Sequence, residues 1–342
     1  MLPPWSVVFG VAFGAAIGSF LNVLIYRLPR NLSIVFPPSH CPACQHRLGL
    51  RDLIPLLSYL LQRGCCRYCR APIALRYWLV ELWSAGVWSW LWWQHLIVGE
   101  LPLRFVLYAL ACSLLIAIFF IDLEHTLIPD ELNLALLTVG LLHAWLLAGQ
   151  PTEWSWARSG VVNLPNALWS AEIGAGVFCL IALLGRLVFQ RDAMGHGDIK
   201  LMRAMGALLL TPAWLTAFAL AVTTGALLGG AWLLWQSRRL HGEPDSAEGE
   251  PPAPEPVMSL LLMCMVYLLW LDVLLSLLPT RWQERVYAWL GSPAEQAEEE
   301  EFVVQPGMLP FGPFLAVGAQ LVLLFGTPFA QAIQAYLNWA GF

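Results

Sequence analysis

The sequence has 342 residues, of which 58% are hydrophobic and only 12% are charged, and its formal net charge at pH 7 is −5. Soluble domains average about 45–50% apolar and about 25% charged residues. The composition therefore excludes a large soluble domain and predicts an all-α polytopic integral membrane protein. An acidic membrane chain of this kind is not expected to bind nucleic acid. The 18 tryptophans agree with this class, because Trp favours membrane interfaces.

About eight stretches are apolar enough to be membrane helices, each of which needs roughly 20 mostly apolar residues. One uncharged run, residues 204–237, is too long for one untilted span, and Thr211 and Pro212 inside it predict a break. The expected helices are residues 5–25, 77–99, 105–121, 132–150 and 173–190, a short sixth ending near Leu210, a seventh from about Pro212 to Trp235, and a last one from about Met308 to the C-terminus.

The loop after the first helix is rich in arginine. Eight arginines and one acid, Asp52, lie between Tyr26 and Arg76. Short loops rich in Lys and Arg stay in the cytoplasm, so this loop sets the predicted orientation. No signal-peptide pattern opens the sequence, and the first helix is expected to remain as a signal anchor. If successive loops lie on opposite sides of the membrane, the segments around Asp122 and Asp198 also face the cytoplasm.

Five cysteines lie in this arginine-rich loop. Cys41 with Cys44, and Cys66 with Cys69, form two Cys-x-x-Cys pairs. Two such pairs predict a four-thiolate zinc site, and four thiolates make the zinc structural because no coordination position stays open. Cys65 is the alternative ligand to Cys66, and a set of reduced, buried cysteines is the alternative to metal binding. The sequence thus predicts a small cytoplasmic zinc-binding loop domain.

Two aspartates end apolar runs on the predicted cytoplasmic side. Asp122 ends "LLIAIFFID", and Asp198 lies in "GHGDIK". Ionisable residues beside membrane helices are functional candidates. Two carboxyl groups that share one proton can act as general base and general acid on a water molecule that attacks an amide. Gly195 and Gly197 would leave room for a substrate backbone. The alternative is that each acid caps a helix or holds an arginine at the membrane border.

Several motifs, in order from the first helix to the last, make the chain resemble the type IV prepilin leader peptidases. These are peptidase/N-methyltransferases of the GxGD class of membrane aspartyl proteases. The motifs are "GSFLNVLIYRLPR" (18–30), "CPAC", "LIPLLSYL" (53–60), "CRYC", "APIALRYWLVE" (71–81), "FFIDLEHTLIPDELN" (119–133), "GHGDIKL" (195–201) and "LPFGPFLAVGA" (309–319).

The resemblance implies a bifunctional enzyme of the bacterial cytoplasmic (inner) membrane whose active site faces the cytoplasm. It would cleave the basic leader from type IV prepilins or pseudopilins after a glycine. It would then methylate the new N-terminal residue, commonly phenylalanine, with S-adenosylmethionine. The expected partners are these substrates, the lipid bilayer, and pilus or type II secretion machinery. The residues assigned by the resemblance are the catalytic Asp122 and Asp198, the motif glycines Gly195 and Gly197, and the zinc ligands Cys41, Cys44, Cys66 and Cys69.

The resemblance leaves three questions open. The methyl-donor site is unknown, because no Gly-rich nucleotide motif is visible. A peptidase without methylation, with zinc only folding the loop, is one alternative function. An ion-coupled transporter is another, although no convincing internal repeat is present. The expected parts of the chain are the first helix (1–25), the zinc loop (26–76), the peptidase core (77–235), an acidic insertion (236–305) and the last helix (306–342).

The insertion contains two acidic linkers, which are predicted to be disordered, on either side of the apolar segment 257–278. In the family the last helix begins on the cytoplasmic side. The apolar segment is therefore expected to enter and leave on that side, as a re-entrant hairpin or an interfacial helix. A ninth span with altered topology is the alternative.

Overall fold

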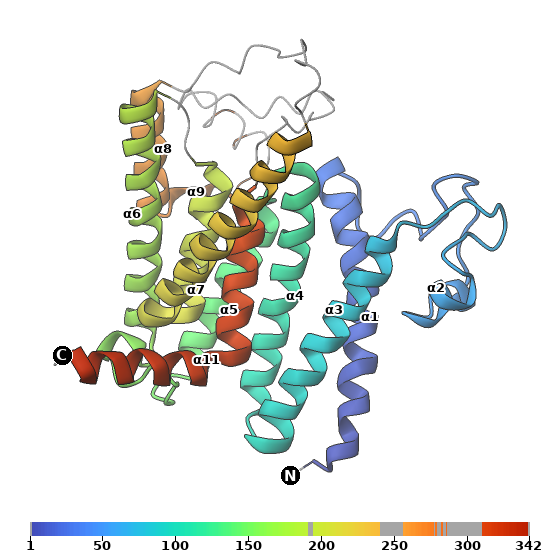
Figure 1. The fold of residues 1–342 in the computed structure, drawn as a ribbon, viewed down its shortest axis with the longest axis horizontal. Coiled ribbons are helices and arrows are strands. Elements are labelled where there is room, and N and C mark those ends of the chain that lie inside the picture. The colour runs from blue at the N-terminus through green and yellow to red at the C-terminus, as the bar shows by residue number, and fades with distance from the viewer. Residues whose placement is uncertain are drawn as a thin grey trace. The chain divides into compact units, whose positions relative to one another are not determined.

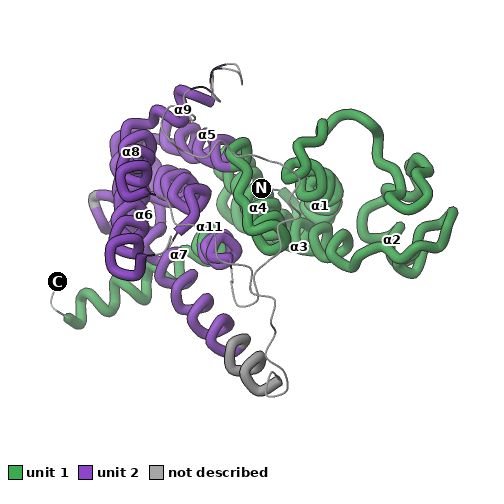
Figure 2. The backbone as a smooth tube through the Cα atoms, turned by 90° about the horizontal axis from the view of Figure 1, so that it is seen from above, with its two compact units in different colours: residues 1–132, 319–342 green, residues 133–318 purple. Residues whose placement is uncertain are grey.

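The computed structural model describes residues 2–190, 194–239, 256–276, 278, 282, 285 and 310–340, and every regular element in these ranges is helical (Figure 1). This confirms the predicted helical class. The chain divides into two compact units, residues 1–132 with 319–342 and residues 133–318 (Figure 2). Most of the two acidic linkers predicted within 236–305 lies outside the described residues.

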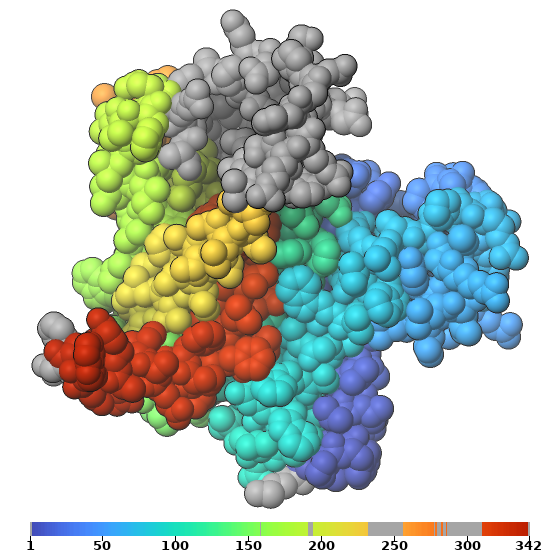
Figure 3. Space-filling model, in the orientation of Figure 1, coloured from blue at the N-terminus to red at the C-terminus, as the bar shows by residue number. Residues whose placement is uncertain are grey.

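Unit 1 is held together by close packing of its first two long helices. A Cβ atom on Gly14 would lie 2.7 Å from the Ser84 carbonyl oxygen, and one on Gly18 only 2.6 Å from the Glu81 Cα. Glycine lets membrane helices approach to this distance. The loop that carries the cysteines stands out beside these helices (Figure 3). The helices of unit 1 are α1 (Val7–Arg27), the short α2 (Leu57–Leu61), α3 (Leu75–Trp92), α4 (Pro102–His125) and the later part of α11 (Gly312–Ala340).

One buried amide, Gln320 on α11, joins three helices of unit 1. Its Oε1 accepts a hydrogen bond from Trp83 Nε1 on α3 at 3.1 Å, and its Nε2 donates to the Cys112 carbonyl on α4 at 3.2 Å. A buried polar side chain is tolerated when both of its ends are bonded. Cys112 is buried, as are Cys179 and Cys264 in unit 2, so these three cysteines are small residues of the helix packing.

Unit 2 is organised around α6, which begins at Leu164 and not at the predicted residue 173. The Asn163 side chain accepts a hydrogen bond from the Asn166 backbone N–H at 2.7 Å, and Pro165 occupies the first turn. These two signals start the helix earlier than hydropathy alone indicates. The helices of unit 2 are most of α5 (Asp130–Leu146), α6 (Leu164–Phe189), α7 (His196–Arg239), α8 (Val257–Leu268), α9 (Leu271–Ser276) and the start of α11.

The break predicted in the long uncharged run lies at Leu210, where α7 has φ 65° and ψ 167°. Both arms of α7 run along α6 in opposite directions. In the first arm Met202 faces Gly174, while in the second arm Phe218 lies against Phe178, with ring centroids 5.5 Å apart. The chain therefore turns back at Leu210 (Figure 1), as the sequence predicts for a sixth and a seventh helix.

The apolar segment of the insertion forms α8, which lies beside α6, followed by the short α9 (Figure 1). A 12-residue helix is about 18 Å long, which is less than the roughly 30 Å of a bilayer core. A buried ion pair ties the segment to α7. The Arg203 guanidinium on α7 donates to both Asp272 carboxylate oxygens, at 2.8 and 2.5 Å, and to the Tyr267 carbonyl at 2.9 Å.

The ion pair between Arg203 and Asp272 leads to a prediction about stability. Asp272→Ala should lower the free energy of unfolding by about 3–5 kcal/mol, because it leaves the Arg203 charge buried without its carboxylate partner. Thermal and denaturant unfolding of the purified protein in detergent would measure the change. The double variant Arg203→Met/Asp272→Leu should recover most of the loss. Glu124→Ala, which breaks the more exposed pair with Arg76, is the control and should cost less than about 1 kcal/mol.

The helices agree with an integral membrane protein. In the described part of the chain, five segments are long and apolar enough to cross a membrane. Helices α3 and α5 occupy two further predicted positions but are not among these five. The five candidate spans are Pro4–Arg30, Pro102–His125, Leu164–Phe189, His196–Ala231 and Gly312–Ala340.

Candidate functional site

The two Cys-x-x-Cys pairs form turns with the same backbone geometry. The residue after each pair, Gln45 or Arg70, is left-handed, with φ 58° and 62°. Its N–H donates to the carbonyl of the first cysteine of its pair, Cys41 at 2.8 Å or Cys66 at 2.9 Å. Each turn thereby directs its two sulfurs to one point, as in structural zinc sites.

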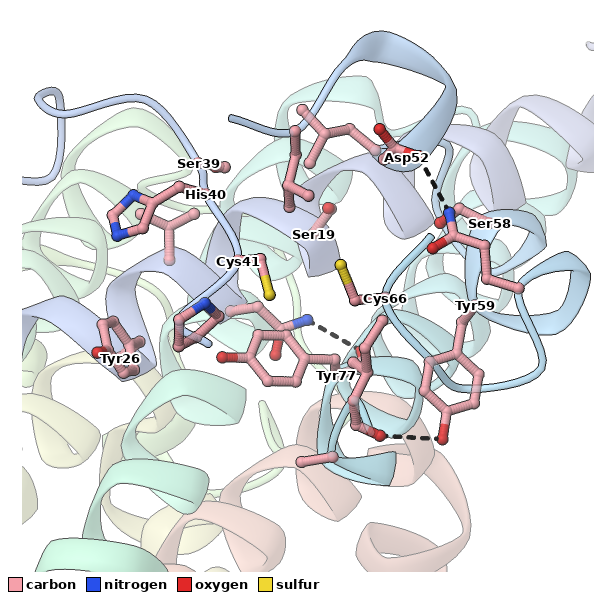
Figure 4. Close-up of a pocket in the computed structure, with 18 of the residues that line it drawn as sticks. Ser19, Tyr26, Ser39, His40, Cys41, Asp52, Ser58, Tyr59, Cys66 and Tyr77 are labelled. Carbon is pink, nitrogen blue, oxygen red and sulfur yellow. Dashed lines mark hydrogen bonds between the residues drawn. The ribbon is translucent and has the colours of Figure 1, made fainter. Parts of the chain in front are cut away.

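The four sulfurs of Cys41, Cys44, Cys66 and Cys69 lie within 4.8 Å of one another. The Cys41 and Cys69 sulfurs are 3.8 Å apart. Zn–S bonds of about 2.3 Å place the sulfurs of a tetrahedral site roughly 3.8 Å apart, so the cluster fits a zinc ion after a small contraction. Figure 4 shows the Cys41 and Cys66 side chains pointing toward one another.

Cys65 lies outside this group of sulfurs. It forms an isolated antiparallel bridge with Pro72, and His40 forms the equivalent bridge with Arg47 beside the first pair. Cys65 and His40 thus precede their pairs at matching positions. The structure brings together the four cysteines chosen from the sequence and leaves out the alternative.

The protonation of the thiols also reflects the shared site. The backbone N–H groups of Cys69 and Tyr68 lower the pKa of Cys66 from 9.0 to about 7. The Ala71 N–H favours the thiolate of Cys69, but burial and the neighbouring thiols outweigh it and raise that pKa to about 11. A divalent cation bound at this cluster would favour the thiolate form of both Cys66 and Cys69.

A cavity of about 960 Å³ lies between the cysteine loop and the helices α1 and α3, all within unit 1. This cavity, here termed the loop cavity, is within the size range of small-molecule sites. The loop contributes Cys41 and Cys66, and Ser19 and Tyr77 come from the two helices (Figure 4).

Glu81 on α3 connects the loop to both helices. Its carboxylate accepts a hydrogen bond from the Leu56 N–H at 2.7 Å and another from the Ser19 hydroxyl on α1. Leu56 has a φ of 63°, an unusual conformation for a leucine, and it begins α2 as its N-cap. The bond from Glu81 therefore holds the strained turn of the "LIPLLSYL" motif against α3.

Asp122 lies in unit 1, in the last turn of α4, and is 5% exposed. Its backbone carbonyl accepts the N–H of Thr126 at 2.8 Å, and the left-handed Thr126 ends the helix. The carboxyl group is thus buried at the end of a candidate span.

Asp198 lies in unit 2, in the first turn of α7, next to Gly197. Its Oδ1 atom is buried and has no hydrogen-bond partner in the described chain. The Asp198 N–H donates to the Gly195 carbonyl at 3.2 Å, and the Asn133 side chain donates to the Gly197 carbonyl at 3.4 Å. Backbone bonds on both sides therefore hold this carboxyl group in place. A buried acceptor without a partner requires an explanation, and a catalytic role for the carboxyl group would provide one.

Comparison with known proteins decides the family. Residues 12–95 match the Bacterial Peptidase A24 N-terminal domain, and residues 109–230 match the Type IV leader peptidase family. A Prepilin leader peptidase/N-methyltransferase of Myxococcus xanthus (strain DK1622) is 34% identical over 97% of this chain and 94% of its own length. The chain belongs to the type IV leader peptidase family.

Other members of the type IV leader peptidase family carry the same name. The protein of Aeromonas hydrophila is 35% identical over 66% of this chain and 81% of its own length. The protein of Dichelobacter nodosus is 27% identical over 96% of this chain and 94% of its own length. No solved structure matches the chain described here.

The two matched regions separate the features of this leader peptidase family member. The four cysteines and the loop cavity fall mainly in residues 12–95, and both aspartates fall in residues 109–230. Asn22 and Asn133 were not singled out from the sequence as functional residues. Each is a polar side chain on a largely apolar helix, and that signal can identify such residues in membrane proteins.

Proposed function

We propose that this chain is a prepilin leader peptidase and N-methyltransferase, with Asp122 and Asp198 as its proteolytic pair. The supporting observation is the buried, unpartnered Asp198 carboxylate oxygen in the "GHGDIK" turn, inside the region that matches the peptidase family. Asp122 is a second buried carboxyl group in that region, at the end of a candidate span. The names of the relatives support both activities.

The topology that we propose contains eight spans: α1, α3, α4, α5, α6, the two arms of α7, and α11. Helices α5 and α6 lie between Asp122 and Asp198 in the sequence. Two crossings return the chain to the side where α4 ends, so both aspartates face one side of the membrane. The arginine-rich loop assigns that side to the cytoplasm, and in a bacterium the membrane is the inner one.

We place the insertion segment on this cytoplasmic side as a re-entrant hairpin. Along α6, Leu268 of α8 lies near Gly176, and Trp270 donates a hydrogen bond to Glu172. From Leu268 to Trp270 the segment therefore runs from the middle of α6 toward its start, before it continues into α9. Because α8 is too short to cross, this path supports a hairpin over a ninth span.

In the proposed reaction, the ionised carboxylate of the pair takes a proton from water, and the water oxygen attacks the carbonyl carbon of the last glycine of the leader. The protonated carboxyl group donates its proton to the departing nitrogen as the C–N bond breaks. The apolar segment of the substrate lies among the membrane helices while its basic leader stays in the cytoplasm. Cleavage at the membrane border follows from this division.

The four cysteines Cys41, Cys44, Cys66 and Cys69 would hold the structural zinc ion. S-adenosylmethionine, when bound, supplies the methyl group for the amine that cleavage exposes. The residues of the chain contribute binding and orientation to this second reaction. Pilus or type II secretion machinery remains the expected destination of the processed substrate.

One experiment tests the proposed function against the two alternatives. The purified protein is incubated with a prepilin peptide and methyl-labelled S-adenosylmethionine, and the products are separated by mass. We expect a shortened peptide that carries one labelled methyl group. Cleavage without label would indicate a peptidase only. Absence of cleavage by a folded wild-type protein, with ion flux in proteoliposomes, would instead support a transporter.

A further inference from the structure

Three polar residues in the first two turns of α7 contact the insertion segment, helices α8 and α9. The ring of Tyr267 on α8 lies 5.7 Å from the ring of His196, between centroids, and its centroid lies 5.5 Å from the Lys200 ammonium. Arg203 donates to the Tyr267 carbonyl and to both carboxylate oxygens of Asp272 on α9. Residues spaced four and three apart share one face of a helix. The insertion segment therefore covers one face of α7 at its start.

Asp198 lies in the same turn of α7 but on a different face. It is two residues from both His196 and Lys200, and residues two apart in a helix do not face the same way. Tyr267 thus contacts the residues that flank Asp198 on each side. The hydrogen bonds of the turn leave the Asp198 Oδ1 atom without a partner in the described chain.

The insertion segment is itself firmly held in unit 2. Tyr267 is only 1% exposed, and Trp270 donates a hydrogen bond to Glu172 on α6. The Arg203 guanidinium lies 5.2 Å from the centroid of the Trp270 ring and forms a two-point contact with Asp272. Such a two-point contact fixes the angle as well as the distance between its partners. The start of α7 is therefore braced against α6 through the insertion segment.

The turn that carries Asp198 needs such a brace. Gly195 and Gly197 lie on either side of it, and glycine gives the backbone more conformational freedom than any other residue. A carboxyl group that acts on water and a peptide bond must be held close to its working position by the residues around it. Contacts at His196 and Lys200 supply a constraint that the two glycines do not.

We propose that the insertion segment positions Asp198 for proteolysis, an inference that rests on the proposed peptidase function. Tyr267 is the central positioning residue, because its ring holds His196 and Lys200 and its carbonyl accepts from Arg203. The pair of Arg203 with Asp272 fixes the register of the segment against α7. The segment touches no reacting atom and acts only through the first two turns of α7.

Steady-state cleavage of a prepilin peptide by the full-length protein in detergent micelles tests the inference. Tyr267→Leu removes the ring and should lower kcat by about 10- to 100-fold, because a small displacement of a reacting group costs about that much. KM should change by less than about twofold, since the segment does not bind the substrate. Tyr267→Phe keeps the ring and should recover most of the rate.

Phe178→Leu is the matched control for loss of stability. It removes another fully buried ring of unit 2, which packs against Phe218 in the second arm of α7. The melting temperatures of Phe178→Leu and Tyr267→Leu should fall by similar amounts. The kcat of Phe178→Leu should nevertheless stay within about twofold of wild type. Equal losses of kcat in the two variants would show that the segment serves stability alone, which would overturn the inference.

The double variant Arg203→Met/Asp272→Leu extends the test to the ion pair. It is expected to keep most of its stability, but apolar packing replaces the two-point contact that fixes the register. Its kcat should fall by about tenfold. Wild-type kcat in Tyr267→Leu, or in the double variant if Tyr267→Leu does not fold, would overturn the inference. Absence of cleavage by a folded wild-type protein would instead refute the proposed peptidase function.

Amide hydrogen exchange measures the turn directly and needs no substrate. In Tyr267→Leu the backbone amides of residues 196–203 should exchange faster than in the wild type, because the turn opens more often. Peptides from residues 212–231, in the second arm of α7, should exchange at the wild-type rate. Unchanged exchange at residues 196–203 would show that the Tyr267 ring does not hold the turn, and would overturn the inference.

Discussion

Asp122→Asn and Asp198→Asn are each expected to reduce cleavage of a prepilin peptide by about 10²- to 10⁴-fold. Asparagine keeps the size of the side chain but cannot take or donate the proton that the reaction moves. Both variants should fold, because the backbone bonds around each position do not use the carboxyl group. Initial cleavage rates, measured by mass spectrometry, give the size of the loss.

Two controls make this prediction specific. Glu124→Gln changes a carboxyl group two residues from Asp122, on the exposed side of α4, where it pairs with Arg76 at 2.9 Å. Its cleavage rate should remain within about twofold of wild type. A pre-cleaved peptide that begins with phenylalanine should still be methylated by both aspartate variants. Wild-type cleavage by either asparagine variant would refute the pair.

The second large effect concerns the zinc loop. Cys66→Ser should lower bound zinc from about one ion per chain to almost none, since a structural site needs all four of its ligands. Cys65→Ser should keep its zinc, because Cys65 occupies the position that His40 holds beside the first pair. Elemental analysis of the purified variants measures both results.

A different pattern of zinc loss would contradict this prediction. Loss of zinc only in Cys65→Ser would show that the second pair uses the preceding cysteine as its ligand. If the prediction holds, Cys66→Ser should also loosen the loop, because a structural zinc ion would hold its two Cys-x-x-Cys turns together. Limited proteolysis of the loop between α1 and α3 would report the accompanying loss of structure.

Much of the fold follows from local patterns. Hydropathy located α1, α3, α4 and α5 to within several residues, and Thr211 with Pro212 located the break at Leu210. The start of α6 was misplaced because a cap made by Asn163 overrode the hydropathy pattern. Short-range signals of this kind predict where helices exist but not what their polar residues contact.

The candidate sites likewise contain some features that local sequence patterns predict and others that they do not. The spacing of two Cys-x-x-Cys pairs is a local signal, so the four clustered sulfurs could be chosen in advance. The partner of Arg203 could not be predicted, because Asp272 lies 69 residues away in an insertion outside the recognised motifs. Glu81 likewise contacts Leu56 across a strained turn that no periodic pattern predicts.

By itself, the sequence determined the class of protein, the helical segments, the cysteine pairs and the aspartates that end apolar runs. These properties depend on hydropathy and on spacing along the chain, which are properties of neighbouring residues. Only the tertiary structure decided which buried atoms lack a partner. Packing of α1, α3 and the loop leaves Asn22 Oδ1 and the Trp78 N–H buried without a partner and places Glu81 on the wall of one cavity.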